Sequence, residues 1–141
     1  MANKRLKVFL DTNVLLAALQ GNKTVNALFK PGPESAVSYV IDPVVLQEFL
    51  LAAQGTSGDL SDVIKHVHIL DAEAPLSPET LAEIRAIRNR LVHANELLIL
   101  GAARNCDILL TYDQDLLSLG DEVGVTAKTP EGFLSELGDK S

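Results

Sequence analysis

One stretch decides the fold of this chain: Lys7-Val8-Phe9-Leu10-Asp11-Thr12-Asn13-Val14-Leu15-Leu16-Ala17-Ala18-Leu19. The apolar run from Leu6 to Leu10 predicts a strand, and the residues from Thr12 to Leu19 predict a helix that closes at Gly21. A strand followed at once by a helix is typical of an α/β sheet, in which ligands bind beyond the carboxyl ends of the strands. Asp11 stands at such an end, either as a helix N-cap or as a residue of a functional site.

The same alternation of strand and helix continues along the chain. Further strands are predicted at residues 37–41, 67–70, 107–111 and 123–126. Helices are predicted at residues 24–29, 44–54, 60–65, 78–91, 95–103 and 115–119 and from residue 130 onward. Because parallel strands need helical crossovers, this order predicts an α/β fold with a central, mainly parallel sheet of four to five strands flanked by helices, in a single domain, 1–141.

Composition restricts the class of protein and its compartment. The 141 residues are 47% hydrophobic and 22% charged, which is typical of a soluble globular domain. There is one cysteine, no apolar run of membrane-spanning length and no secretory signal at the start, so we expect a cytoplasmic protein without membrane association. The net charge of −7 argues against a surface covered in phosphate-binding groups but allows a local basic patch.

Acidic residues gather at predicted strand ends. Asp11 follows the first strand and Asp113 follows the fourth, while Glu48 lies on the helix after the second strand and can lean over the same sheet edge. Clustered carboxylates repel each other unless a cation neutralises them, and hard oxygen ligands suit Mg²⁺ or Mn²⁺. Such ions activate water and stabilise charge on a phosphodiester. The pattern therefore predicts hydrolysis of a phosphodiester backbone.

Five segments, in their order and spacing, match one known family. They are VFLDTNVL at 8–15, VLQEFL at 45–50, NELLILGAA at 95–103, DILLTYDQDLL at 107–117 and TPEGFL at 129–134. Together they resemble the PIN-domain family, the nuclease fold of VapC-type toxins and related ribonucleases. The resemblance implies a PIN-like three-layer sandwich and a metal-dependent ribonuclease, the toxin of a toxin–antitoxin pair. It also implies an RNA substrate, a small antitoxin partner and a homodimer.

The resemblance assigns roles residue by residue. Asp11, Glu48 and Asp113 match the acidic positions of the family that hold Mg²⁺ or Mn²⁺. Polar residues that would support them are Asn13, Thr111 and Asp115, the last being an alternative to Asp113.

The fourth acidic position departs from the family pattern. The family usually places an aspartate at the head of an Ala-rich helix, and counting back from Ala102 puts Asn95 there. Glu96 is adjacent, but neighbouring helical positions point about 100° apart. Either Glu96 substitutes after a register shift, or Asn95 serves as a neutral ligand and the metal binds more weakly. The alternative function is a catalytically weakened PIN-like module that binds RNA or a protein partner without cutting.

Other polar residues receive structural interpretations. Asp42 before Pro43 reads as a helix cap. His66 and His68 share a strand face but lack further zinc ligands at suitable spacing, and Cys106 reads as core filler. Surface roles are predicted for four basic residues that could otherwise contact phosphates: Arg85, Arg88, Arg90 and His93.

Overall fold

The sheet is entirely parallel. The computed structural model describes residues 5–30, 37–56, 58–70 and 94–139, without the side chains of 94–98, 138 and 139. Its strands are β1 (Leu6–Leu10), β2 (Val37–Ile41), β3 (His68–Ile69), β4 (Ile108–Leu110) and β5 (Ala127–Lys128). They are ordered β3-β2-β1-β4-β5, and each neighbouring pair is parallel. The predicted sheet is confirmed.

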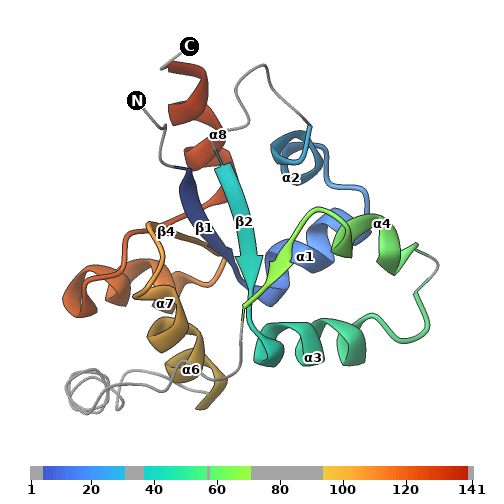
Figure 1. Cartoon of the computed structure of the whole chain (residues 1–141), viewed down its shortest axis with the longest axis horizontal. Helices are drawn as coiled ribbons and strands as arrows, with labels where there is room; N and C mark the ends of the chain where they lie inside the picture. The colour runs from blue at the N-terminus through green and yellow to red at the C-terminus, as the bar shows by residue number, and fades with distance from the viewer. Residues whose placement is uncertain (1–4, 31–36, 57, 71–93, 140–141) are drawn as a thin grey trace.

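Helices cover both faces of this sheet. Between β1 and β3 lie α1 (Thr12–Leu19), α2 (Lys23–Leu28), α3 (Pro43–Ala52) and α4 (Leu60–Ile64), and later in the chain come α6 (Ala94–Ala103), α7 (Gln114–Leu119), the 3₁₀ turn η2 (Gly120–Val123) and α8 (Pro130–Asp139). In Figure 1, α1 to α4 lie to the right of the strands, and α6 and α7 lie to the left. This is the predicted three-layer arrangement. None of the described helices is long and apolar enough to span a membrane.

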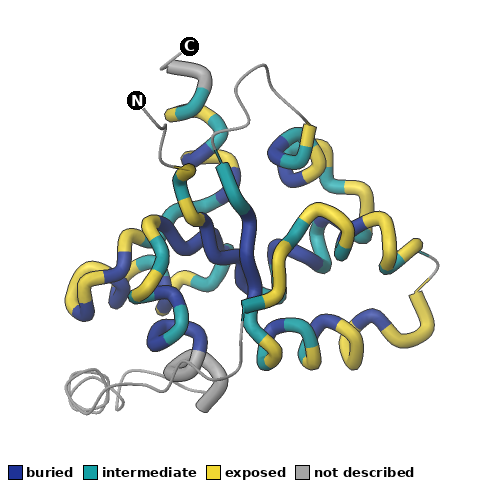
Figure 2. The backbone as a smooth tube through the Cα atoms, viewed as in Figure 1, coloured by how far each residue is buried: buried dark blue, intermediate teal, exposed yellow. Residues whose placement is uncertain are grey.

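The central position of β1 explains its composition. Val8, Phe9 and Leu10 are fully buried, because β2 and β4 flank the strand and helices cover its faces. Phe9 is in register with Val40 on one side and Leu109 on the other. Figure 2 shows the buried residues concentrated along the strands and on the inner sides of the helices.

Three helices that follow strands begin on an aspartate cap. Asp11 caps α1, Asp42 caps α3 by accepting from the Val45 N–H at 2.9 Å, and Asp113 caps α7. A short side chain that accepts the free N–H groups of a first turn ends a strand and starts a helix in one step. The predicted cap at Asp42 is confirmed. Because the caps follow the carboxyl ends of parallel strands, they make this edge of the sheet acidic.

The predicted last strand at 123–126 is wrong. Residues Gly120–Val123 form η2, which ends at Gly124 with a φ of 77°. The N–H of Val125 donates to the Gly120 oxygen at 2.8 Å, so the chain turns before β5 starts at Ala127. Val123 and Val125 are both buried at this turn. Their spacing of two residues resembles the alternation of a strand, which explains the wrong prediction.

Several other expectations concern residues outside the sheet core. The ring of His66 stacks on Phe29 with centroids 4.8 Å apart, which agrees with a structural role for this histidine. The predicted helix at 78–91 lies outside the described residues, as do four basic residues assigned to the surface: Arg85, Arg88, Arg90 and His93.

Candidate functional site

Asp11 is the centre of the acidic edge. Its side chain is only 5% exposed and sits where β1 passes into α1. The Oδ1 atom accepts the Thr12 backbone N–H at 2.7 Å. The Oδ2 atom accepts from Asn13 Nδ2 at 3.1 Å and from Thr111 Oγ1 at 2.6 Å. Three donors therefore fix both oxygens of a buried carboxylate.

The end of β4 is joined to Asp11 by side chains of both segments. The Tyr112 backbone N–H donates to Asn13 Oδ1 at 3.2 Å, and the Asp113 N–H donates to Thr111 Oγ1 at 3.0 Å. Asn13 thus bridges Asp11 and Tyr112, while Thr111 bridges Asp11 and Asp113. The structure therefore places Asn13 and Thr111 beside Asp11, and their supporting role stays a prediction.

Glu48 reaches the same region from α3. This half-buried side chain lies inside the helix, and its Oε1 accepts from Thr12 Oγ1 at 2.9 Å. The contact exists because α1 and α3 pack against each other on one face of the sheet. The sequence predicts Glu48 at this edge but does not predict Thr12 as its hydrogen-bond partner. The one feature of the sequence that could have pointed to the Thr12 hydroxyl is its position next to Asp11.

The electrostatics agree with a gathering of like charges. Burial raises the pKa of Asp11 above its usual range, and hydrogen bonds from Thr111 and Thr12 oppose this shift. The negative charges of Asp113 and Glu48 raise the pKa of Asp11 further. Burial also raises the pKa of Asp42, and Glu48 adds to it. The acidic edge is therefore a place where a positive charge would be favourable.

The remaining predicted residues contribute less within the described structure. Asp113 is half-buried, and its Oδ1 accepts from the N–H groups of Asp115 and Leu116 at 2.8 and 3.3 Å. The side chain of Asp115 is exposed in the first turn of α7. Asn95 and Glu96 lie in the first turn of α6, which packs against α3, but their side chains lie outside the described part of the chain.

The oxygen atoms around Asp11 are of the chemical type that binds a hard divalent cation. Carboxylate and hydroxyl oxygens surround Asp11, and such oxygens are the ligands that Mg²⁺ and Mn²⁺ prefer. Among the side chains that the structure describes, no three Asp, Glu, His or Cys groups come together closely enough to hold one ion. The arrangement is therefore an acidic edge centred on Asp11, with the predicted fourth position beyond the described side chains.

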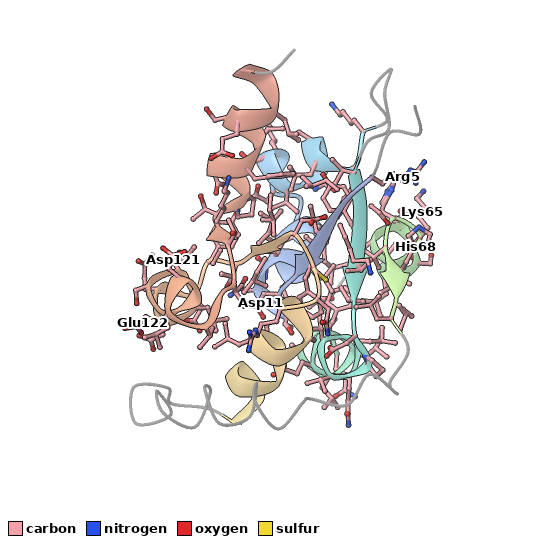
Figure 3. The ribbon with its side chains drawn as sticks, turned by 60° about the vertical axis from the view of Figure 1, so that its left-hand side comes forward. Arg5, Asp11, Lys65, His68, Asp121 and Glu122 are labelled. Atoms are coloured by element: carbon pink, nitrogen blue, oxygen red, sulfur yellow. The ribbon has the colours of Figure 1, made fainter. Side chains whose placement is uncertain are left out.

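The site lies away from several other charged groups of the surface. In Figure 3, Asp11 is near the middle of the molecule, whereas Arg5, Lys65 and His68 are at one side. Asp121 and Glu122 on η2 are at the opposite side in this view.

Comparison with known proteins was made at the levels of sequence and of structure. No family model matches the chain, and no curated protein matches its sequence. Solved structures do match. VapBC2 from Rickettsia felis, bound to a DNA fragment from its promoter, superposes with a TM-score of 0.57 at 16% identity, over 88% of this chain and 98% of that one.

Two further complexes give similar values. A toxin–antitoxin complex from Klebsiella pneumoniae has a TM-score of 0.59 at 16% identity, over 87% of this chain and 97% of the other. VapBC-1 from nontypeable Haemophilus influenzae has a TM-score of 0.59 at 17% identity, over 89% and 99%. Two of these neighbours are VapBC proteins and one is a toxin–antitoxin complex, and at such low identity the likeness establishes a shared architecture. This chain has the PIN-like fold.

Proposed function

We propose that the chain is a metal-dependent ribonuclease of the PIN type, and that it is the toxin of a toxin–antitoxin pair. The observation that carries the proposal is the buried carboxylate of Asp11, held by three donors beside Glu48 and Asp113. Gathered carboxylates repel one another, and a bound cation would offset that repulsion. The PIN-like fold and its toxin–antitoxin neighbours support the same function.

Mg²⁺ or Mn²⁺ would be held by Asp11, Glu48 and Asp113, which would have to move closer together than they lie in the structure, with Asn95 or Glu96 completing the set. When bound, the ion supplies positive charge that balances the carboxylates and stabilises negative charge developing on a phosphodiester. The protein's own contribution is positioning. Asn13 and Thr111 hold Oδ2 of Asp11 in a fixed direction, so little reorganisation is needed at the reacting phosphate.

The toxin–antitoxin neighbours support one proposed partner of this chain, a small antitoxin protein. We propose RNA as its substrate and a homodimer as its assembly from the resemblance to the PIN-domain family. Co-expression with the protein encoded by an adjacent small reading frame, followed by size-exclusion chromatography, would test the first and third of these.

Cleavage of single-stranded RNA in Mn²⁺ tests the activity. The parent protein should cut a labelled RNA, and EDTA should stop cleavage. Asp11→Asn should abolish it, whereas Asp121→Asn, a matched change at an exposed residue of η2, should leave it unchanged. Equal inactivity of the parent and Asp11→Asn at high protein concentration would contradict the nuclease assignment.

A second candidate function is a PIN-like module that binds RNA or a protein partner without cutting. It is favoured by Asn95 at the head of α6 and by the absence, among the described side chains, of three metal-binding groups around one point. Retention of intact RNA in EDTA, measured by fluorescence anisotropy, together with no cleavage in Mn²⁺, would select this candidate.

A further inference from the structure

Thr12 contacts both of the carboxylates that lie nearest to the start of α1. Its backbone N–H donates to Asp11 Oδ1 at 2.7 Å, and its hydroxyl donates to Glu48 Oε1 at 2.9 Å. One residue therefore joins two acidic side chains that come from different elements, 37 positions apart in the chain (48 − 11). The sequence pattern allows for the first contact as a helix N-cap but gives no sign of the contact with Glu48.

The two contacts of Thr12 are chemically separable. Asp11 is already the cap of α1 and uses the backbone N–H of Thr12, which any residue except proline supplies. The hydroxyl is not needed for that cap, and its described contact is with Glu48. A β-branched side chain has restricted χ1 freedom, so the hydroxyl has few directions available, and in the structure it donates to Glu48. The hydroxyl therefore acts on Glu48 in particular.

Glu48 needs such a partner more than Asp11 does. Asp11 has a short side chain that is buried and held by three donors, whereas Glu48 is longer, only half-buried and adds its charge to that of Asp11. Repulsion between the two carboxylates favours turning the glutamate away from Asp11. A donor between them offsets part of that repulsion and fixes their separation.

We propose that Thr12 is a positioning residue, whose hydroxyl holds Glu48 beside Asp11 so that both carboxylates face one divalent cation. This inference rests on the proposed metal site and specifies how its second ligand is placed. Groups that donate a hydrogen bond to a metal ligand orient that ligand and raise metal affinity.

Mn²⁺ affinity, measured by calorimetry or by electron paramagnetic resonance, tests the role directly. Thr12→Val keeps the shape and the backbone N–H but removes the hydroxyl, and it should weaken Mn²⁺ binding about tenfold. Thr12→Ser should restore binding to near the parent value. Thr56→Val is the matched control, because that hydroxyl donates to the Ala53 oxygen at 2.8 Å, in the turn after α3, and should not affect Mn²⁺ binding.

A double-mutant cycle separates positioning from a general effect on the fold. In a Glu48→Ala background, which lacks the oxygen that accepts the Thr12 hydroxyl, Thr12→Val should cause less than about a twofold further loss of affinity. The full tenfold loss in that background would overturn the proposal.

Unfolding in EDTA supplies a readout without metal. Thr12→Val should lower the melting temperature by about 3 °C in the parent but by less than about 1 °C in a Glu48→Ala background. An equal decrease in both backgrounds would overturn the contact itself.

If the parent binds no Mn²⁺, the proposed metal site fails, and the role of Thr12 toward a cation fails with it. If the parent binds Mn²⁺ and Thr12→Val binds it equally well, only the role of Thr12 fails.

Discussion

The hydroxyl of Thr111 donates to Oδ2 of Asp11 across 2.6 Å, although the two residues are 100 positions apart in the chain. Both side chains are buried, with exposed fractions of 0% for Thr111 and 5% for Asp11. The contact follows from the pairing of β4 with β1, which places the ends of these two strands side by side. The end of β4 therefore helps to fix the side chain at the end of β1.

Loss of this hydroxyl should destabilise the protein. Thr111→Val leaves a buried carboxylate oxygen with one donor fewer, and we expect it to lower the free energy of unfolding by about 2 kcal/mol. Thr111→Ser keeps the donor and should cost less. Urea unfolding in EDTA measures both changes. Equal stabilities for Thr111→Val and the parent would show that the bond contributes nothing to the metal-free fold.

A further carboxylate beside Asp11 should be unfavourable without metal. In Asn13→Asp, an oxygen replaces the Nδ2 group that donates to Asp11 Oδ2, so repulsion replaces a hydrogen bond. We expect a loss of roughly 1 kcal/mol in EDTA at pH 7, decreasing as the pH is lowered. Asn22→Asp is the control, because it adds the same charge at the cap of α2, where aspartate is well tolerated. Equal losses for both variants would contradict the prediction.

The stability of the metal-free protein should depend on pH through Asp11. Its pKa is raised in the folded state, chiefly by burial, so the folded state favours the protonated carboxyl relative to the unfolded state. This contribution to stability is fully present below the unfolded pKa near 3.8 and is lost as the pH rises through the higher folded pKa.

Urea unfolding in EDTA at a series of pH values above 3.8 measures this loss. The Asp11→Asn variant should show a shallower dependence, with a residual slope of the same sign from Asp42, whose pKa is also raised. Saturating Mn²⁺ should reverse the trend in the parent, because it binds the ionised form. A pH dependence unaffected by Asp11→Asn would exclude this carboxyl as its source.

Restoring the acidic residue at the head of α6 should strengthen the metal site. If position 95 faces the cation, Asn95→Asp adds a charged ligand, and we expect Mn²⁺ affinity to rise about tenfold and any RNA cleavage to increase with it. Asn105→Asp, at an exposed position just beyond α6, controls for the added charge. No change in affinity for Asn95→Asp would place Glu96 at the site instead, or neither residue.

The turn before β5 should not tolerate a side chain at Gly120. A Cβ atom there would lie 2.8 Å from the Val125 oxygen and 3.2 Å from Ala127 Cβ. Because the first neighbour is backbone, Gly120→Ala should destabilise the protein by about 1–3 kcal/mol in urea unfolding. Ser118→Ala, at an exposed position on α7, is the control and should be close to neutral. A stable Gly120→Ala variant would mean that the turn shifts freely.

Local signals in the sequence predict the elements around Asp11 well. The bounds of β1 and α1 agree with the structure because an apolar run, an aspartate cap and a positive-φ glycine at position 21 mark each change of direction within a few residues. The assignment of Asp42 as a cap succeeds for the same reason. These features depend on neighbouring residues alone.

Features that depend on distant packing could not be read from the sequence. The bond from Thr12 to Glu48 requires α1 to lie against α3, and no spacing within either helix indicates it. The position of β5 depends on which residues pair with Leu109 and Leu110 in the sheet, and these are Ala127 and Lys128. The sequence does not show this pairing, so the buried residues Val123 and Val125 were predicted to form the strand instead. The grouping of Asp11, Glu48 and Asp113 was predicted from the ends of parallel strands, and the resemblance to a family assigned roles to the same three residues.

The placement of β1 between β2 and β4 also orders events during synthesis. The ribosome makes Asp11 a hundred residues before the Thr111 hydroxyl that holds it on the β4 side. A nascent chain that has emerged only as far as α4 already carries Asp11, Glu48 and β2 but lacks β4 and Asp113. The acidic edge can therefore be completed only after β4 has left the ribosome.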